Sequence, residues 1–375
     1  MAGFIAALFY ASVGQLQGAE TVLTNRFLGA ASCASSGCHG GGGQAQNQSL
    51  VWSLRDSHSQ RAFATLTTAR AKQIADGLQI KDPTTDGRCT SCHAPLSEVP
   101  TVLRGEAFKV NEGVSCESCH GPAEGWLRSH TRLDYSHADR VFAGMRDLEN
   151  LYGRANNCVA CHQTVEVSLL KAGHPELIFE LDGQSVSQPK HWREKADWNG
   201  AQSWFVGQAV ALRELSWQLL REPEPNEKLT ARWSALLWLL QKLDGLDSEF
   251  SGLSPLSAEP SEQNFRATLT ASDDLAKRVA GSLWTDEMSR RALAAVAAAG
   301  GDFQQANVGV QFQARRAERL VLALDRLLAA NRQPQPNPNV DVNLNRLFKQ
   351  VQSLPDFDSA EFAEAMSQFS QSLSQ

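Results

Sequence analysis

Apolar and polar residues recur with a helical period over the second half of the chain. From about residue 201 to 221, and again from about 226 to 243, apolar side chains return every three or four positions, and the first of these segments ends before Pro223 and Pro225. A third stripe precedes the Pro-rich segment RQPQPNPN and comprises Leu320, Val321, Leu324, Leu327 and Leu328. This spacing predicts amphipathic helices, because the apolar residues of a half-buried strand fall at every second position instead.

The two ends of the chain carry weaker patterns. The apolar run Gly3 to Val13 is shorter than the roughly 20 residues that a membrane span needs, but it has the length of the apolar part of a secretory signal. A buried strand or helix is the alternative, and no Lys or Arg precedes the run. From about Val340 to Gln375 the pattern indicates short amphipathic helices or a loosely held tail.

Composition separates the chain into a part with reactive side chains and a part without them. The 375 residues are 42% hydrophobic and 20% charged, which is ordinary for a soluble protein of two to three domains. The net charge of −6 has no clustered basic stretch behind it, so nucleic acid is not an expected partner. All eight Cys and all nine His lie between Cys33 and His191. Chemistry that needs thiols or imidazoles is therefore confined to this region.

The eight cysteines form four pairs, and a histidine follows each pair directly. The motifs are Cys33-x4-Cys38-His39, Cys89-x2-Cys92-His93, Cys116-x2-Cys119-His120 and Cys158-x2-Cys161-His162. C-x-x-C-H is the attachment signature of c-type haem, in which two sulfurs form thioethers at one porphyrin edge and the imidazole binds the iron. The small residues in the wider first loop leave room for the same reaction. We expect four covalently attached haems, with these four histidines as proximal ligands.

Three other uses of such cysteines fit less well. A zinc site closes with four ligands, so four successive C-x-x-C-H units would leave imidazoles without a role. A thioredoxin-like pair occurs singly within a βαβ pattern, which is absent from this sequence. A disulfide framework is typical of short secreted chains and does not place each pair beside a histidine. Haem attachment uses every cysteine of the chain.

The sixth ligand of each iron largely decides between electron transfer and substrate binding. His58 belongs to an apolar stripe at helical spacing, His130 follows Trp126 by one helical turn, and His174 and His191 stand in the segments AGHPELIFE and QPKHW. An isolated histidine at the position of His58 would usually be a satisfied core residue, but beside four haems we favour all four of these histidines as distal iron ligands. His137 stands among polar neighbours and is expected to be a surface residue, and Met145 is a weaker candidate ligand.

Together these segments resemble one known family, the multihaem cytochromes c of the cytochrome c-552/c-554 domain type. The resemblance rests on SCASSGCHGG, DSHSQRAFATL, RCTSCHAP, GVSCESCHGPAEGW with His130, GMRDLENLYGRANNCVACH, KAGHPELIFE, and PKHW followed by WFVGQAVALRE. It implies the same proximal ligands and places His58, His130, His174 and His191 at the family's distal positions. Two features that are frequent in similar chains are missing: Val167 stands where another histidine would be, and no fifth haem motif follows His191.

The expected fold is therefore mainly α, with a compact multihaem module that has few regular strands and a helical C-terminal domain. We expect a signal peptide over residues 1–20, a tetrahaem module over 21–199, a helical domain over 200–332, and a Pro-rich linker with a short helical tail over 333–375. Covalent haem attachment belongs to exported bacterial compartments, and no Cys lies near residue 20 to carry a lipid anchor. A periplasmic or secreted protein without a transmembrane span is the prediction.

The favoured function is electron transfer through four closely spaced, mostly bis-His haems, with no catalytic residues. The alternative is a haem enzyme in which one iron has an open position and binds a nitrogen or sulfur oxyanion or nitric oxide. Each ferric bis-His haem adds about −1 and each ferrous one about −2 to the charge of the protein. A redox partner with a basic docking face is therefore expected, and the protein can also form an oligomer or part of a larger electron-transfer complex.

Overall fold

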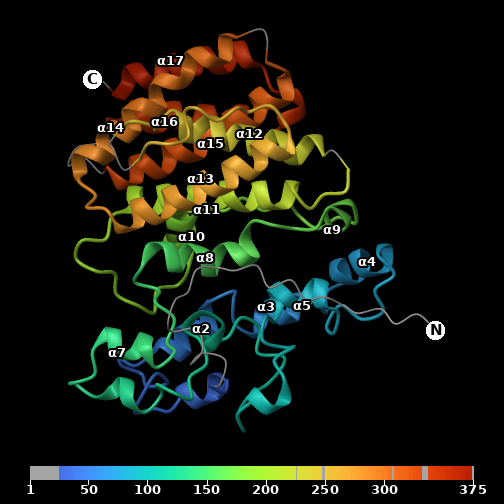
Figure 1. The fold of residues 1–375 in the computed structure, drawn as a ribbon, viewed down its shortest axis with the longest axis vertical. Coiled ribbons are helices and arrows are strands. Elements are labelled where there is room, and N and C mark those ends of the chain that lie inside the picture. Colours follow the sequence, from blue (N-terminus) through green and yellow to red (C-terminus); the bar gives the residue numbers. More distant parts are fainter. Residues whose placement is uncertain (1–24, 225, 247–249, 306–307, 332–336, 374–375) are drawn as a thin grey trace. The chain divides into compact units, whose positions relative to one another are not determined.

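The computed structural model describes residues 25–373 apart from 225, 247–249, 306–307 and 332–336. The predicted signal peptide lies outside the described residues, as does the start of the Pro-rich linker. The described residues are mainly helical and contain no sheet, and an isolated bridge joins Phe27 to Arg104 (Figure 1). The expected mainly α fold is confirmed. No helix in this part of the chain is long and apolar enough to cross a membrane.

The chain divides into two compact units. Among the described residues, unit 1 comprises 25–71 and 82–147, and unit 2 comprises 72–81 and 148–373. Three of the four Cys-Cys-His motifs lie in unit 1, and the fourth lies in unit 2 with the C-terminal helices. The predicted boundary at residue 199, between the tetrahaem module and the helical domain, stays a prediction.

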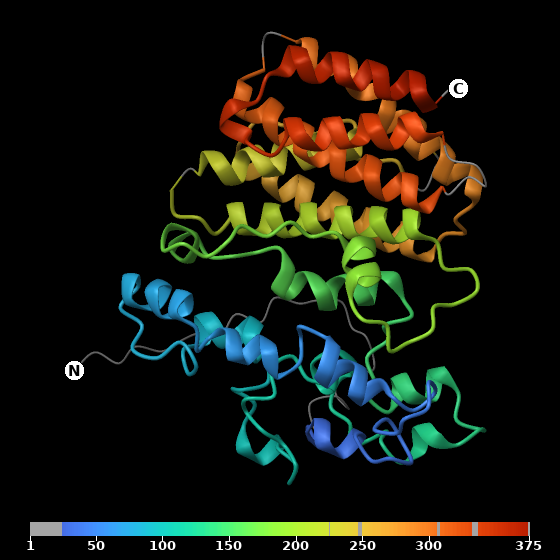
Figure 2. The ribbon, with the colours of Figure 1, turned by 180° about the vertical axis from the view of Figure 1, so that it is seen from behind.

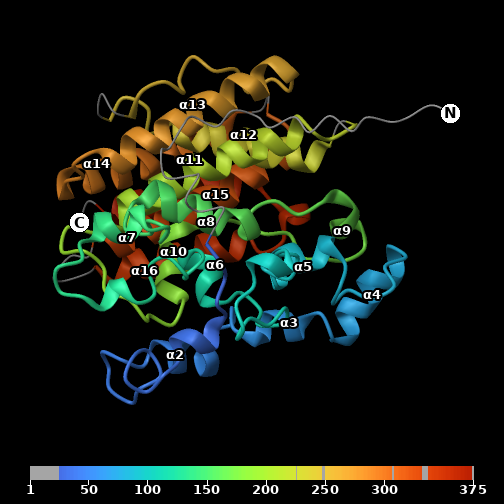
Figure 3. The same ribbon diagram turned by 60° about the horizontal axis from the view of Figure 1, so that its bottom comes forward.

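Unit 1 consists of short helices joined by loops, which Figure 3 shows from below. In chain order they are η1 (Ala30–Cys33), α2 (Gln48–Arg55), α3 (Gln60–Thr65), α5 (Gly87–His93), η2 (Thr101–Leu103), α6 (Cys116–His120), η3 (Ser129–Thr131) and α7 (His137–Phe142). Helix α4 (Ala69–Gly77) crosses the division between the units. Helices of one or two turns are marginal by themselves, so tertiary contacts or a bound group must stabilise them.

Unit 2 is a stack of longer helices, seen from the front in Figure 1 and from behind in Figure 2. They are α8 (Leu151–His162), α9 (Val167–Lys171), α10 (Leu181–Ser187), α11 (Gly200–Leu219), α12 (Glu227–Gln241), α13 (Glu262–Gly281), α14 (Asp286–Ala297), η5 (Ala298–Gln304), α15 (Val310–Ala330), α16 (Pro338–Gln350), η6 (Leu354–Asp356) and α17 (Ser359–Leu373). The three helices expected from periodicity are present as α11, α12 and α15, and the segment after the linker forms α16 and α17. Polar side chains begin several of these helices, as where Asn199 accepts the backbone N–H of Ala201.

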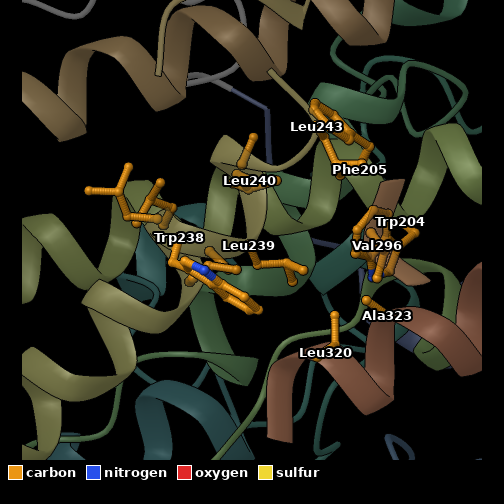
Figure 4. Close-up of a cluster of buried hydrophobic side chains, with 14 of the residues drawn as sticks. Trp204, Phe205, Trp238, Leu239, Leu240, Leu243, Val296, Leu320 and Ala323 are labelled. Carbon is orange, nitrogen blue, oxygen red and sulfur yellow. The ribbon is translucent and has the colours of Figure 1, made fainter. Parts of the chain in front are cut away.

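The hydrophobic core of the described residues lies within unit 2. It extends from Leu151 to Phe369 and surrounds α11, most of whose residues are buried. Figure 4 shows part of it, with Trp204 and Phe205 of α11, Trp238 and Leu239 of α12, Val296 of α14 and Leu320 of α15. Each fully buried Val, Leu or Phe side chain of this core contributes about 1.5–3 kcal/mol through the hydrophobic effect. Unit 2 can therefore fold around its own apolar side chains.

Candidate functional site

Three of the motifs end a helix at their histidine. Helices α5, α6 and α8 end at His93, His120 and His162. The two cysteines of each motif are three residues apart on these helices, so both sulfurs lie on one face with the imidazole at the end of the same turn. The C-x-x-C-H spacing therefore places two thiols and one imidazole on the same face of the helix.

The first motif reaches a similar arrangement with a folded loop. Helix η1 ends at Cys33, and the loop that follows is closed by backbone hydrogen bonds from Cys38 N to Ser35 O at 3.0 Å and from His39 N to Cys33 O at 3.2 Å. The four-residue spacer therefore returns His39 to the backbone of Cys33. This geometry supports the expectation that the widened motif can act like the regular ones.

Six histidines share a feature that sequence reasoning did not predict: Nδ1 faces a hydrogen-bond acceptor. Nδ1 lies close to an acceptor in His39 (Gln48 Oε1, 3.0 Å), His58 (Asp56 Oδ1, 3.0 Å), His93 (Ala62 O, 3.0 Å), His130 (Leu127 O, 2.6 Å), His174 (Pro175 O, 2.9 Å) and His191 (Pro189 O, 3.5 Å). A histidine that binds a metal commonly donates its other ring N–H in this way, which fixes the tautomer and the ring orientation. Such contacts are those expected of histidines that bind a metal through Nε2.

His162 follows the same pattern through a glutamine side chain. The side-chain nitrogen of Gln184 in α10 lies 3.2 Å from His162 Nδ1, and the oxygen of the same amide is buried without a hydrogen bond. Turning the amide by 180° places that oxygen on Nδ1, where it accepts the ring N–H. Gln184 therefore orients His162, the candidate proximal ligand of the fourth motif.

His137 differs from the other histidines in the nitrogen that is held. Its Nε2 lies 3.1 Å from Asp147 Oδ1, and both side chains are more than a third exposed. The nitrogen through which the other histidines would bind iron is in this residue hydrogen-bonded to a carboxylate. The structure therefore gives no reason to promote His137 from a surface residue to a ligand.

Two of the candidate ligands form a close ring pair within unit 1. The ring centroids of His39 and His130 are 6.1 Å apart, and the ring planes differ by 23°. Two imidazoles on opposite sides of one iron have centroids roughly 6 Å apart, because each nitrogen–metal bond is about 2 Å long. Trp126 stands edge-on to His130 with centroids 5.5 Å apart and limits the positions that the ring can take.

Buried carboxylates join the segment before the first motif to the third motif. Glu117, inside C-E-S-C-H, accepts the backbone N–H groups of Leu28 at 2.8 Å, Gly29 at 2.6 Å and Ala123 at 2.8 Å, and Glu112 accepts that of Ala30. Burial raises the pKa of Glu117 and of Glu112, while these hydrogen bonds lower it. At Gly29 φ is +88°, and a Cβ there would lie 2.4 Å from Ala107 O, so the segment needs glycine.

An ion pair connects the His191 segment to the helix of the fourth motif. Arg154 of α8 donates to both oxygens of Glu194, with Nη1–Oε1 at 3.0 Å and Nη2–Oε2 at 3.0 Å, and Trp192 Nε1 donates to Oε1 at 2.7 Å. Both members of the pair are largely buried. Unit 2 thus holds His162 together with two candidate distal ligands, His174 and His191, whereas unit 1 holds three motifs with His58, His130 and His137.

A second group of buried charges lies in unit 2 around the start of α10. Burial raises the pKa of Glu180 to about 8 and that of Asp182 to about 6, against the opposing effect of Arg319 and Arg326. The arginines stand at 3.7 Å from these carboxylates, and burial lowers the pKa of the Arg319 guanidinium. One oxygen of Glu180 is buried without a hydrogen bond.

The apolar residues of unit 1 fit a large apolar cofactor. The buried apolar residues of its described part are scattered and mostly small, and none belongs to the core cluster, which begins at Leu151. Large apolar side chains are exposed instead, among them Leu50, Leu54, Val102, Leu133 and Phe142. A unit with so little core needs another apolar body to fold around. The described residues contain no cluster of three or more Cys, His, Asp or Glu arranged for a metal ion, as a zinc site would require.

Several of these supporting residues escaped the sequence analysis. Tertiary or loop contacts alone connect four of them to candidate ligands or motifs: Asp56, Glu117, Gln184 and Glu194. A weak signal existed for Asp56 and Glu117, because one stands two residues before a candidate ligand and the other inside a motif.

The comparisons with known proteins agree with the family resemblance over part of the chain. Residues 32–121 match the family described as cytochrome c554 and c-prime. No curated protein and no solved structure matches the chain. The matched region contains the first three motifs and His58. This stretch is therefore similar to that of a c-type cytochrome, a family of proteins with covalently bound haem.

Proposed function

We propose that the protein transfers electrons through four covalently bound haems, one at each Cys-Cys-His motif. The observation that carries the proposal is the orientation of the histidines: three proximal and all four distal candidates have a hydrogen-bonding group at Nδ1, as expected of imidazoles that bind a metal through Nε2. Irons with two firmly held imidazoles are closed to substrates. Such a site supports electron transfer rather than chemistry on a bound molecule.

The residues divide the work of holding each haem. The cysteines Cys33, Cys38, Cys89, Cys92, Cys116, Cys119, Cys158 and Cys161 would form the thioethers, and His39, His93, His120 and His162 would bind the irons. The haem supplies an iron that alternates between the ferric and ferrous states. The chain fixes its distance to the next centre, its orientation and its access to water.

We assign His39 and His130 as the two axial ligands of the haem at the first motif. Their ring separation of 6.1 Å and the small angle of 23° between the ring planes support this pairing. Their Nδ1 atoms are held by Gln48 and by the backbone of Leu127, so both rings are fixed before haem binds. The remaining distal candidates His58, His174 and His191 complete the set that we propose.

Contacts between motifs support electron exchange between neighbouring haems. The side chains of Cys33 and Cys116 interact directly, and Glu117 ties the segment before Cys33 to the helix that carries Cys116. Haems attached at the first and third motifs would therefore share adjoining edges. Short distances of this kind let electrons pass between centres without any movement of the chain.

A second candidate function follows from the distribution of histidines over the units. Unit 1 has three motifs but only two distal candidates with Nδ1 held, His58 and His130. The third histidine outside its motifs, His137, is hydrogen-bonded through Nε2 instead. Where each haem takes its distal ligand from its own unit, this distribution leaves one haem of unit 1 with an open position. Such a haem would bind nitric oxide or a nitrogen or sulfur oxyanion.

We propose a periplasmic or secreted location, on the grounds of the apolar start of the chain and of covalent haem attachment. Four haems make the protein more acidic, which supports a redox partner with a basic docking surface. Assembly into an oligomer or a larger electron-transfer complex belongs to the same proposal.

Intact mass and electron paramagnetic resonance test the proposed function. The mass should exceed that of the processed polypeptide by four haems, and a mass with three would show that the first motif is not used. The oxidised protein should show only low-spin iron if all four irons have two imidazoles. A high-spin signal of about one haem equivalent that responds to nitric oxide would instead favour the enzyme.

A further inference from the structure

A buried carboxylate holds one of the distal candidates. Asp56 is fully buried, and its Oδ1 accepts both the backbone N–H of His58 at 2.9 Å and the ring Nδ1–H at 3.0 Å. The Asp56 side chain therefore lies over the turn between α2 and α3 and accepts two hydrogen bonds from His58. The apolar stripe that contains His58 indicates neither contact.

The other histidines with a held Nδ1 face neutral acceptors. His39 meets the amide of Gln48, His93 the carbonyl of Ala62, and His130 the carbonyl of Leu127. The neighbours of His162, His174 and His191 are likewise an amide or backbone carbonyls. The second histidine–aspartate pair in the described residues, His137 with Asp147, is made through Nε2.

We propose that Asp56 is a positioning residue that lowers the reduction potential of the haem that His58 binds. The proposal rests on the proposed function, since it needs His58 as an iron ligand. The haem bound by His58 would then differ from the others in the charge of the group that accepts the Nδ1–H of its ligand.

The physical reason is that a ferric centre carries one more positive charge than a ferrous one. A carboxylate that accepts the Nδ1–H makes the imidazole a stronger donor to iron and adds a negative charge nearby, and both effects favour the ferric state. Burial of Asp56 keeps water from screening that charge. The couple takes up one electron and no proton, because the hydrogen stays on Nδ1.

The turn that carries Asp56 is held firmly enough to keep this geometry. The His58 carbonyl accepts the backbone N–H of Val114 at 2.7 Å, and Ser59 Oγ donates to the Asp56 carbonyl at 2.9 Å. Gly113 lies against the same turn with φ +74°, where a Cβ would come within 2.0 Å of Ser59 O. Asp56 therefore keeps its position when the charge of the iron changes.

Asp56→Asn in the full-length haem protein tests the proposal, with Asp147→Asn as the matched control. Asparagine keeps the size and a hydrogen-bond acceptor but removes the charge. Spectroscopic redox titration should show one haem whose ferric-to-ferrous equilibrium moves about tenfold toward the ferrous form, which is about 59 mV for one electron. The other haems should keep their potentials, and Asp147→Asn should move none.

Each other outcome has a defined meaning. Unchanged potentials in Asp56→Asn overturn the role of Asp56, and a shift in Asp147→Asn overturns it as well, because His137 would then be the carboxylate-held ligand. If Asp56→Asn does not fold, Asp56→Glu replaces it. A reduction potential close to the wild-type value supports the role of the charge. A ferric-to-ferrous equilibrium that moves tenfold or more toward the ferrous form overturns it. Absence of haem from the wild-type mass would instead refute the proposed function.

Discussion

Arg154 of α8 and Glu194 form a two-pronged ion pair in which two guanidinium nitrogens each lie 3.0 Å from a carboxylate oxygen. The pair joins the helix that ends in His162 to the segment that contains His191. Parallel hydrogen bonds of this kind fix orientation as well as distance. The candidate ligand three residues away is thereby held to the unit that carries the fourth motif.

Removing this pair should loosen unit 2 near the fourth motif. Glu194→Ala leaves the largely buried Arg154 guanidinium without its carboxylate, which we expect to cost about 3 kcal/mol of unfolding free energy. Arg290 and Glu287 provide the control, because their ion pair on α14 is exposed and Glu287→Ala should cause no measurable loss. Guanidinium unfolding followed by circular dichroism measures both. Equal losses in the two variants would contradict the role of the buried pair.

Glu117→Ala should destabilise unit 1. The change removes the acceptor of three backbone N–H groups, two of which are buried, and we expect a loss of about 2–4 kcal/mol. Glu124→Ala is the control, since that carboxylate is much more exposed. Haem content by mass and unfolding followed by haem absorbance give the readout. Full haem loading with unchanged stability in Glu117→Ala would show that the segment before Cys33 does not depend on this carboxylate.

His130→Ala should open one iron. The ring pair with His39 predicts that this variant converts one haem from low spin to high spin in electron paramagnetic resonance while the haem count stays the same. His137→Ala should leave the spectrum unchanged, because Asp147 holds its Nε2. A new high-spin signal in His137→Ala, with none in His130→Ala, would reverse the assignment.

The stability of unit 2 should depend on pH through Glu180. Its pKa in the folded protein, about 8, lies above the ordinary value of 4.5, so the folded state binds more protons between these two pH values. Unfolding free energy should therefore fall as pH rises from about 4.5 to about 8, and the raised pKa of Asp182, about 6, adds to the lower part of this range.

Glu180→Gln isolates this effect, because it removes the titration and keeps the shape. The decline in unfolding free energy between pH 5 and 8 should shrink by at least about 1 kcal/mol. Glu361→Gln, at an exposed position of α17, is the control and should leave the decline as it is. The slope with pH is the quantity to compare, since loss of the partner of Arg319 changes the absolute stability in its own way. An unaltered slope in Glu180→Gln would show that this carboxylate is ionised throughout.

The two units should differ in their need for haem. Protein produced without haem attachment should keep the helices of unit 2, which have their own apolar core, and lose ordered structure in unit 1. Hydrogen exchange with mass spectrometry should then show protected amides after residue 148 and rapid exchange over residues 25–71 and 82–147. Strong protection of unit 1 without haem would mean that its loops suffice to hold the fold.

The sequence alone predicted the chemistry of haem attachment. Spacing along the chain fixes which thiols share a helical turn with an imidazole, so the four motifs and their proximal histidines could be named without coordinates. Helices α11, α12 and α15 were predicted for a similar reason, since their apolar periodicity is a local property.

Only the tertiary structure decided which side chains support the ligands. The contacts of His58 with Asp56 and of His162 with Gln184 depend on how turns and helices pack, and the pairing of His39 with His130 joins residues 91 positions apart. The same holds for the charge state of Glu180, because burial rather than residue type sets its pKa. A sequence lists the groups that can bind iron, but the direction of a ring nitrogen and the charge behind it arise when distant segments meet.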